Sequence, residues 1–172
     1  MRKPKSQRVG VFVDVSNMYH CARHLYGSFV NFGQVLKDVV AGRQLIRAIA
    51  YVVSADVEQE KAFFEALAKA GFEVKEKELQ VFADGTKKGD WDVGISVDAI
   101  TLADRLDAVV LVTGDGDFVP LVEFLKHNKG SRVEVVAFGR SCSGRLIEEA
   151  DEFLDLDKNS RRYLIKPVSR GR

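Results

Sequence analysis

Cysteine and long apolar runs are both scarce in this chain of 172 residues. Its two cysteines, Cys21 and Cys142, match no zinc-binding spacing and give no sign of the disulfide framework found in small secreted domains. The apolar run after the charged N-terminus stops at Asp14, so it is too short for a signal peptide or a membrane helix. We therefore expect a protein of the reducing cytoplasm that has no membrane partner.

Several catalytic signatures are also missing. The chain has no GxxxxGK[ST] loop, which argues against nucleoside triphosphate hydrolysis. It has no HExxH pattern either, and the pair His20 and His24, although spaced like zinc ligands on a helix, would need a third ligand nearby. Asp14 is followed by Val15 and Ser16, so the DxDx[TV] motif of haloacid-dehalogenase phosphatases is absent. The candidate functional groups that remain are the carboxylates of the aspartates.

Acidic residues are absent from both ends of the chain. Residues 1–8 carry four basic side chains and residues 158–172 carry six. Residues 9–157 therefore hold 16 basic and all 25 acidic side chains. The basic terminal segments are either ordinary solvated tails or binding elements for phosphate groups, and the sequence leaves both interpretations open. The expected organisation is a basic arm at 1–8, one domain at 9–157 and a basic tail at 158–172.

Apolar runs of strand length alternate with segments of helical periodicity. Buried strands are expected at residues 9–13, 45–53, 108–112 and 133–138, an edge strand at 72–79 and a last short strand at 153–156. Helices are expected at 55–70, 91–106, 118–128 and 146–149, with a polar loop at 82–89. In the first of these helices, Phe63 belongs to the predicted buried face. This alternation predicts a three-layer α/β fold, a parallel sheet with helices on both faces in the strand order 3-2-1-4-5.

Three aspartates follow the ends of two predicted strands. Asp14 comes after the strand at 9–13, and Asp115 and Asp117 come after the strand at 108–112. In an open α/β sheet a ligand binds beyond the carboxyl ends of the strands, where the strand order reverses, so these carboxylates should converge. Two such charges about 4 Å apart repel by roughly 4 kcal/mol at an effective dielectric near 20, which implies raised pKa values or a bound metal. Oxygen ligands favour Mg2+ or Mn2+ over zinc, while a helix N-cap is the alternative role for each acid.

A second group of acids enters the helix predicted at 91–106. Asp92 shares a helical face with apolar residues, an unfavourable position unless its carboxylate has a partner, so it is a candidate metal ligand. Asp90 is expected to be the N-cap of this helix. Asp98 lies about 240° around the helix from Asp92, at 100° per residue, so it is either a residue that supports the metal ligands or a structural one.

Three segments of the chain resemble the signature blocks of a known family. The NYN family, the LabA-like branch of the PIN-like nucleases, has blocks similar to FVDVSN, KKGDWDVGISVDAI and VTGDGDFVPLVEFLKHNKGSRVEVVAF, and the likeness spans roughly residues 9–157. The resemblance implies a PIN-like α/β fold and metal-dependent cleavage of RNA. It implies that Asn17 binds a phosphate or orients an aspartate. It also implies that the family's acidic positions match Asp14, Asp92, Asp115 and Asp117.

Other polar residues near these acids have expected supporting roles. Lys87 and Lys88 precede the acidic helix in a glycine-flanked segment, so they either contact substrate phosphates or belong to a solvated loop. Ser16 and Thr113 stand beside the two strand ends and are expected to support the metal ligands.

The preferred function is a metal-dependent ribonuclease that uses Mg2+ or Mn2+ and prefers single-stranded RNA. Two alternatives stay open: a non-catalytic RNA-binding or regulatory module with the same fold, and a metal-dependent phosphohydrolase that acts on a small phosphoester. Tyr19, Tyr26 and Phe29 follow the first aspartate and could stack on bases, but such residues are more often core or rim. The sequence does not give the oligomeric state, so a homodimer is kept as one option.

Overall fold

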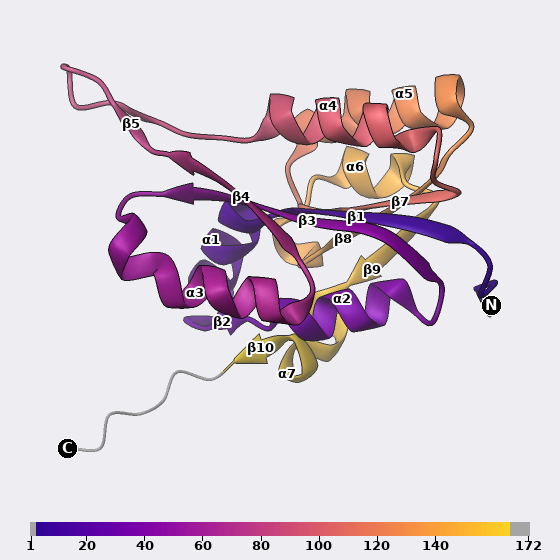
Figure 1. Cartoon of the computed structure of the whole chain (residues 1–172), viewed down its shortest axis with the longest axis horizontal. Helices are drawn as coiled ribbons and strands as arrows, with labels where there is room; N and C mark the ends of the chain where they lie inside the picture. Colours follow the sequence, from indigo (N-terminus) through magenta and orange to yellow (C-terminus); the bar gives the residue numbers. More distant parts are fainter. Residues whose placement is uncertain (1–2, 166–172) are drawn as a thin grey trace.

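The computed structural model describes residues 3–165, which contain a central sheet of six strands (Figure 1). Parallel pairings join these strands in the order β4-β3-β1-β7-β8-β9. The predicted order 3-2-1-4-5 is confirmed, and β9 adds the expected last strand beside β8. The strands are β1 (Arg8–Asp14), β3 (Gln44–Ser54), β4 (Glu73–Glu78), β7 (Ala108–Val112), β8 (Arg132–Ala137) and β9 (Glu152–Asp155).

The side chains of each strand match its place in the sheet. All residues of β7 are buried, because this apolar strand lies in the middle of the sheet and helices cover both of its faces. Among the described strands β4 pairs only with β3, and none of its residues is fully buried. It is therefore an edge strand, as predicted, and its charged side chains protect the free edge from pairing with another chain.

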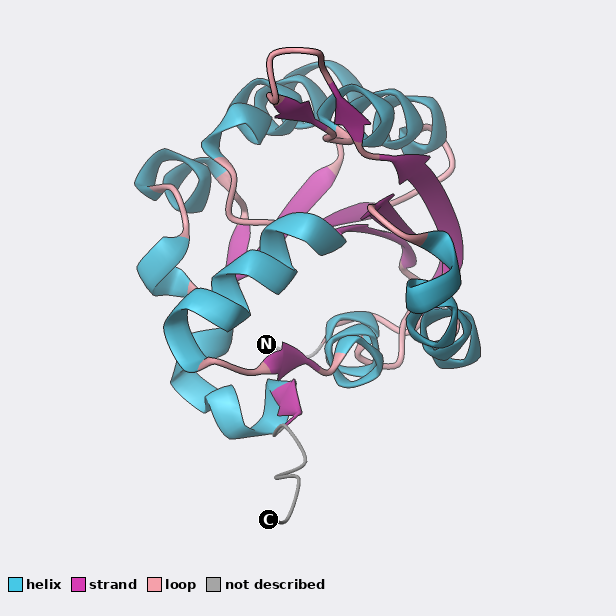
Figure 2. Ribbon diagram, turned by 90° about the vertical axis from the view of Figure 1, so that its left-hand side faces the viewer, coloured by secondary structure: helices cyan, strands magenta, loops and turns pink. Residues whose placement is uncertain are grey.

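Helices cover the sheet on both faces, as Figure 1 and Figure 2 show. Alternate residues of β1 serve the two cores: Val11 and Val13 belong to the apolar cluster under α1, α2 and α3, whereas Phe12 belongs to the cluster under α4, α5 and α6. Within residues 3–165, no helix is both long enough and apolar enough to cross a bilayer. The first layer contains α1 (Val15–Tyr26), α2 (Phe32–Val40) and α3 (Val57–Ala70), and the second contains α4 (Asp92–Ala103), α5 (Val119–Lys129) and α6 (Gly144–Glu149).

Two stretches of the chain differ from the predicted pattern. The stretch predicted to be a polar loop, residues 82–89, contains the turn and second strand of a short antiparallel hairpin, formed by β5 (Gln80–Val81) and β6 (Lys87–Lys88). Gly85 closes its turn with a positive φ of 85°. Helix α2 was not predicted, although Asn31 caps it by accepting a hydrogen bond from Gln34 N at 3.1 Å.

The segment after residue 157, predicted to be part of a basic tail, is folded as far as the structure describes it. It forms η3 (Leu156–Asn159), α7 (Ser160–Tyr163) and β10 (Leu164–Ile165), which pairs with β2 (Phe29–Val30). Tyr163 is buried, and its hydroxyl donates a hydrogen bond to Asp38 at 2.8 Å, so an aromatic anchor holds this basic segment on the domain. The rest of the predicted tail, residues 166–172, lies outside the described residues.

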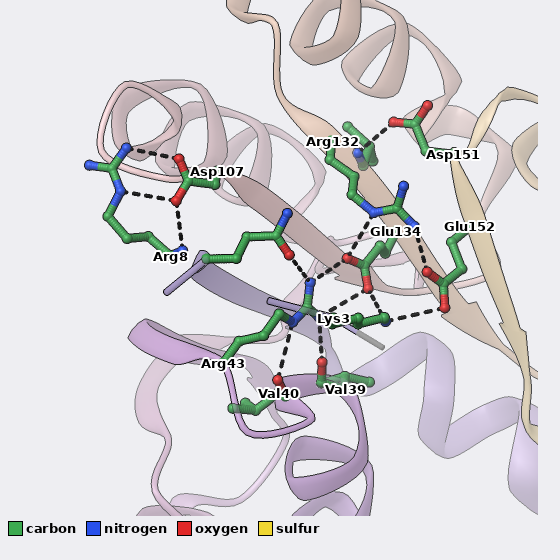
Figure 3. Close-up of polar contacts among 12 residues, drawn as sticks. Lys3, Arg8, Val39, Val40, Arg43, Asp107, Arg132, Glu134, Asp151 and Glu152 are labelled. Atoms are coloured by element: carbon green, nitrogen blue, oxygen red, sulfur yellow. Dashed lines mark hydrogen bonds and ion pairs between the residues drawn. The ribbon is translucent and has the colours of Figure 1, made fainter. Parts of the chain in front are cut away.

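An ion-pair network covers the amino ends of the strands (Figure 3). Arg43 and Glu134 form a bidentate pair with N···O distances of 2.7 and 3.0 Å, and their side chains are 0% and 4% exposed. Lys3 reaches the carboxylate of Glu134 at 2.6 Å, and Arg8 pairs with Asp107 at 3.0 Å. Lys3 and Arg8 of the predicted N-terminal arm are thus engaged with acids of the domain.

Candidate metal centre

Asp14 ends β1 and caps α1, so its carboxylate lies at the carboxyl end of the sheet. One of its oxygens accepts a hydrogen bond from Asn17 N at 3.3 Å, and the other accepts one from Thr113 Oγ1 at 3.1 Å. The second bond is possible because β1 and β7 are neighbours, with Val13 opposite Val112. The capping role considered for Asp14 is therefore present, but a carboxylate has further lone pairs that can bind a cation.

Asp115 lies in a tight loop between β7 and the short helix η1 (Gly116–Phe118). Its carboxylate accepts a hydrogen bond from Asp117 N at 2.9 Å. Its own N–H donates to Thr113 Oγ1 at 3.2 Å. The hydroxyl of Thr113 therefore connects the two strand ends, because it donates to Asp14 and accepts from the backbone of Asp115.

The two glycines of this loop allow a neighbouring segment to approach closely. A Cβ at Gly116 would lie 2.8 Å from Ser143 Oγ, and a Cβ at Gly114 would lie 3.1 Å from the backbone oxygen of Ser141. Ser143 N donates to Gly114 O at 3.0 Å, and Gly114 N donates to Asn17 Oδ1 at 2.9 Å. The glycines of the GDGD motif thus permit the packing that fixes this loop beside α1.

Asp92 is the first residue of α4. The N-cap of this helix is Trp91, so the prediction that Asp90 occupies the cap was wrong; Asp90 Oδ1 instead accepts a hydrogen bond from Asp92 N at 3.2 Å. Trp91 determines how the chain enters the helix, because its Nε1 donates to Val52 O at 2.9 Å. Its ring covers Gly94, where a Cβ would lie 2.5 Å from the ring. This anchoring directs the start of α4, and with it Asp92, toward the strand ends.

Asp14, Asp92 and Asp115 meet at one point. Each offers one carboxylate oxygen, and these oxygens lie within 4.8 Å of one another. Burial, reinforced by the negative charges of Asp115 and other neighbouring aspartates, raises the pKa of Asp92 to about 6. Burial also raises the pKa of Asp14 above its usual value, although hydrogen bonds from Asn17 and Thr113 oppose this change. The site concentrates negative charge at an energetic cost.

No positive side chain of the described residues relieves this cost. The ion pairs formed within residues 3–165 include none with Asp14, Asp92 or Asp115. Asp117 is exposed and lies outside the group of three, but its charge contributes to the raised pKa of Asp92. Three converging carboxylates without a cationic side chain are a suitable donor set for a divalent ion.

The other predicted site residues divide into two groups. Ser16 and Asn17 line the cleft that contains the acids. Asp98 does not join them, because its carboxylate accepts hydrogen bonds of 2.7 Å from Tyr51 Oη and from Lys75 Nζ. Burial acts to raise the pKa of Asp98, but these two hydrogen bonds outweigh it and hold the pKa below its usual value. Asp98 thus connects α4 to β3 and β4. It does so from a different side of the helix than Asp92, in agreement with the separation of about 240° around the helix.

Lys87 and Lys88 lie in the hairpin beside the cleft. Both side chains are exposed and neither lines the cleft, but Leu79 and Gly89, which flank the hairpin, do line it. The two lysines therefore belong to the rim at most, since neither lines the cleft that holds the three carboxylates.

The acids open into a cleft of about 820 Å³ at the carboxyl end of the sheet. Its lining includes residues that the sequence did not assign to the site, among them Asp90, Glu60 and Phe63. Glu60 and Phe63 come from α3, which no motif connects to the acidic blocks. Only the crossover from β3 to α3 brings them to the cleft, so the sequence held no local signal for them.

The comparisons with known proteins agree with this geometry. The family model described as NYN domain matches residues 8–157. The chain is 28% identical over 175 residues to the low amplitude and bright protein LabA of Synechococcus elongatus, and the match covers 96% of this chain and 91% of that protein. The crystal structure of a protein of unknown function from Vibrio parahaemolyticus superposes with a TM-score of 0.86 at 34% identity, over 96% of this chain and 100% of the other.

Proposed function

This chain belongs to the NYN domain family, and we propose that it is a ribonuclease that uses Mg2+ or Mn2+ to hydrolyse phosphodiester bonds in single-stranded RNA. Members of this family are in general nucleases, so a hydrolase acting on nucleic acid is the expected class. The proposal locates the enzyme in the cytoplasm and keeps a homodimer as one option for its assembly. Its catalytic unit is the domain at 9–157, with the basic segments 1–8 and 158–172 as additions.

The observation that carries the proposal is the meeting of Asp14, Asp92 and Asp115. Their three oxygens lie within 4.8 Å of one another, close to twice the Mg–O distance of about 2.1 Å. All three donors are carboxylate oxygens, the ligand type that Mg2+ and Mn2+ prefer. Zinc sites, in contrast, usually include nitrogen or sulfur ligands. The residues present therefore fit a divalent ion of the Mg2+ class.

A divalent ion bound here supplies a Lewis acid that neutralises charge on the phosphate and makes water a stronger nucleophile. The protein's own part is to hold the ligands in place. Thr113 and the N–H of Asn17 orient Asp14, and the N–H of Asp117 orients Asp115. Asp117 is proposed as a further metal ligand, reached directly or through water.

Asn17, Lys87 and Lys88 are proposed as contacts to the substrate. The oxygen of the Asn17 side chain is committed to Gly114 N, so its amide nitrogen is the group available to donate to a phosphate. The two lysines come from the hairpin at the cleft rim, where their positive charge would attract the backbone of RNA beyond the cleaved bond.

A cleavage assay tests the proposal. Asp92→Asn and Asp115→Asn should each lower manganese-dependent cleavage of an unstructured RNA by 100-fold or more, since each 1.36 kcal/mol lost from transition-state stabilisation is tenfold in rate. Asp104→Asn is the matched control, because Asp104 is exposed at the far end of α4 and pairs with Lys129. Its activity should equal that of the wild type.

Three outcomes would contradict the proposal. Full activity in either cluster variant would exclude the acids from catalysis. Wild-type protein that binds RNA but cleaves none with either metal would indicate a binding module. Faster hydrolysis of a small phosphoester than of RNA would indicate a phosphohydrolase.

A further inference from the structure

The cleft that holds the acids also has an aromatic wall, formed by Tyr19, Phe29 and Phe63. Tyr19 and Phe29 are each 40% exposed and Phe63 is 37% exposed, and all three line the cleft. The ring centroids of Tyr19 and Phe29 are 6.0 Å apart. Phe63 was predicted to be part of the core, but its neighbour Phe64 is buried in its place. Three half-exposed rings in one concave surface are apolar area without a partner in the described part of the chain.

Helix α1 connects this wall to the acids. Asp14 caps the helix and Tyr19 follows five residues later, about 7.5 Å along the axis at 1.5 Å per residue. Successive bases in a stacked strand are about 3.4 Å apart, so the wall begins about two base steps from the acids. Phe29 adjoins Tyr19, and Phe63 reaches the cleft from α3, with its ring 6.2 Å from that of Phe32. The wall therefore draws its three rings from α1, β2 and α3.

The charges around the cleft indicate how it recognises a ligand. Within residues 3–165, neither lysine nor arginine lines the cleft, whereas several acids do. A cation lies just beyond the wall, where the guanidinium of Arg23 stands 5.1 Å from the centre of the Phe29 ring. Inside the cleft, phosphates are therefore repelled except at a bound metal ion and at the amide of Asn17, so contacts to the bases must supply much of the affinity there.

We infer that the aromatic wall of Tyr19, Phe29 and Phe63 is a base-stacking subsite, which selects unpaired nucleotides next to the phosphodiester held at the acids. This inference rests on the proposed function. Stacking of a base on an aromatic ring is favourable for every base, because each base has a π face. Arg23 extends the surface, since an arginine that lies over an aromatic ring also presents a flat face to the next base.

The subsite favours a single strand over a duplex for a physical reason. In a duplex each base already stacks on its neighbours and pairs with the other strand, so no base face is free for Tyr19 or Phe63. A strand whose bases are unstacked can place them on the wall and its phosphate at the acids together. The same wall would leave a small phosphoester without bases largely unbound.

The test replaces each ring by leucine, which keeps apolar volume and removes the π face. Tyr19→Leu, Phe29→Leu and Phe63→Leu should each raise the KM for an unstructured RNA about 10-fold, and the triple variant should raise it about 100-fold or more, with kcat changed much less. Phe124→Leu is the matched control, because Phe124 is 38% exposed on α5 and does not line the cleft. Its KM should stay at the wild-type value.

An oligonucleotide with the same backbone but no bases separates the inference from the proposed function. Wild-type protein should cleave it with a KM raised to the level that the triple variant shows for normal RNA, and the ring substitutions should then change nothing further. Equal KM values for normal and abasic RNA in the wild type, or an unchanged KM in the triple variant, would overturn the inference while cleavage itself stands.

Binding provides a readout that does not depend on cleavage. Fluorescence anisotropy with the Asp115→Asn variant should show single-stranded RNA bound at least 10-fold more weakly when the three rings are leucine. Equal affinity would overturn the inference. Wild-type protein that binds RNA through the rings but cleaves none would instead overturn the proposed ribonuclease activity.

Discussion

The two ends of the central sheet treat acidic side chains in opposite ways. At the amino ends of the strands, Glu134 is paired with Arg43 and Lys3, and Asp107 is paired with Arg8 (Figure 3). Burial acts to raise the pKa of Glu134, but the hydrogen bonds from Arg43 and Lys3 hold it below its usual range. The hydrogen bonds from Arg8 lower the pKa of Asp107 to about 2.

The carboxyl ends of the same strands carry acids without such partners. There the pKa of Asp92 is raised to about 6 by burial and by the charges of neighbouring aspartates. A protein that brings carboxylates together without cations loses folding stability, and such sites persist when they serve a function. The difference between the ends indicates that the amino end stabilises the fold, whereas the carboxyl end is suited to a ligand of positive charge.

The largest effect is expected at the amino end. Arg43→Ala should lower the free energy of unfolding by about 3 kcal/mol, because it leaves Glu134 buried without its bidentate partner. Urea denaturation of the purified protein measures this. Cleavage per folded molecule should remain at the wild-type level, because the pair lies away from the cleft. A loss below about 1 kcal/mol would show that Lys3 and Arg132 satisfy Glu134 without Arg43.

A substitution at the carboxyl end of the sheet is expected to change the free energy of unfolding in the opposite direction. Without metal at pH 7, Asp92→Asn should raise the free energy of unfolding by up to about 1 kcal/mol, an amount reduced for the partial exposure of the side chain. The asparagine removes one of the converging charges and keeps the size of the side chain. Denaturation curves recorded in EDTA measure the change, and a loss of stability would contradict the account of the cluster.

The pH dependence of this variant sharpens the contrast. Because the pKa of Asp92 is raised to about 6 in the folded protein, from an ordinary value of 3.8, the folded protein binds this proton more tightly than the unfolded chain. The metal-free wild type should therefore lose stability from this group as pH rises from about 4 to 6, and Asp92→Asn should not. Asp107 acts in the opposite direction, since its lowered pKa makes it stabilising above about pH 4 and this stabilisation disappears as pH falls toward 2.

A smaller effect is expected from the basic C-terminal residues. The folded segment through Ile165 should be kept, because Tyr163 is part of the core. Deleting residues 166–172 removes Lys166, Arg170 and Arg172. Binding of single-stranded RNA should weaken, and the slope of log affinity against log salt should become shallower by about 0.7 for each lost phosphate contact. An identical slope would show that these residues do not touch RNA.

The sequence predicted the features of this molecule that depend on local patterns. Apolar runs located the strands that carry Asp14 and Asp115, and the rule that ligands bind at the carboxyl ends of strands predicted that these acids meet. Asp92 could be proposed because an acid on an apolar helical face needs a partner, and the structure places its carboxylate beside those of Asp14 and Asp115.

The features that escaped prediction depend on contacts between distant segments. Asp90 looked like the N-cap of α4, but the hydrogen bond from Trp91 to Val52 shifts the start of the helix. The basic tail was expected to be either solvated or bound to phosphate, and neither interpretation included the hydrogen bond by which Tyr163 anchors it beside Asp38. The position of Phe63 in the cleft depends on how α3 packs after the β3 crossover. No local sequence pattern predicts these contacts, because each joins segments that are far apart in the chain.

The melting temperature with and without manganese at pH 7 tests the central claim most directly. If the cluster of Asp14, Asp92 and Asp115 binds the ion, a manganese concentration about 100 times the dissociation constant should stabilise the wild type by about 2.7 kcal/mol, or roughly 5–10 °C for a chain of this size. Asp115→Asn should lose most of this shift and Asp104→Asn should keep all of it. A wild type that gains no stability from manganese, or an Asp115→Asn variant that gains as much as the wild type, would contradict the account.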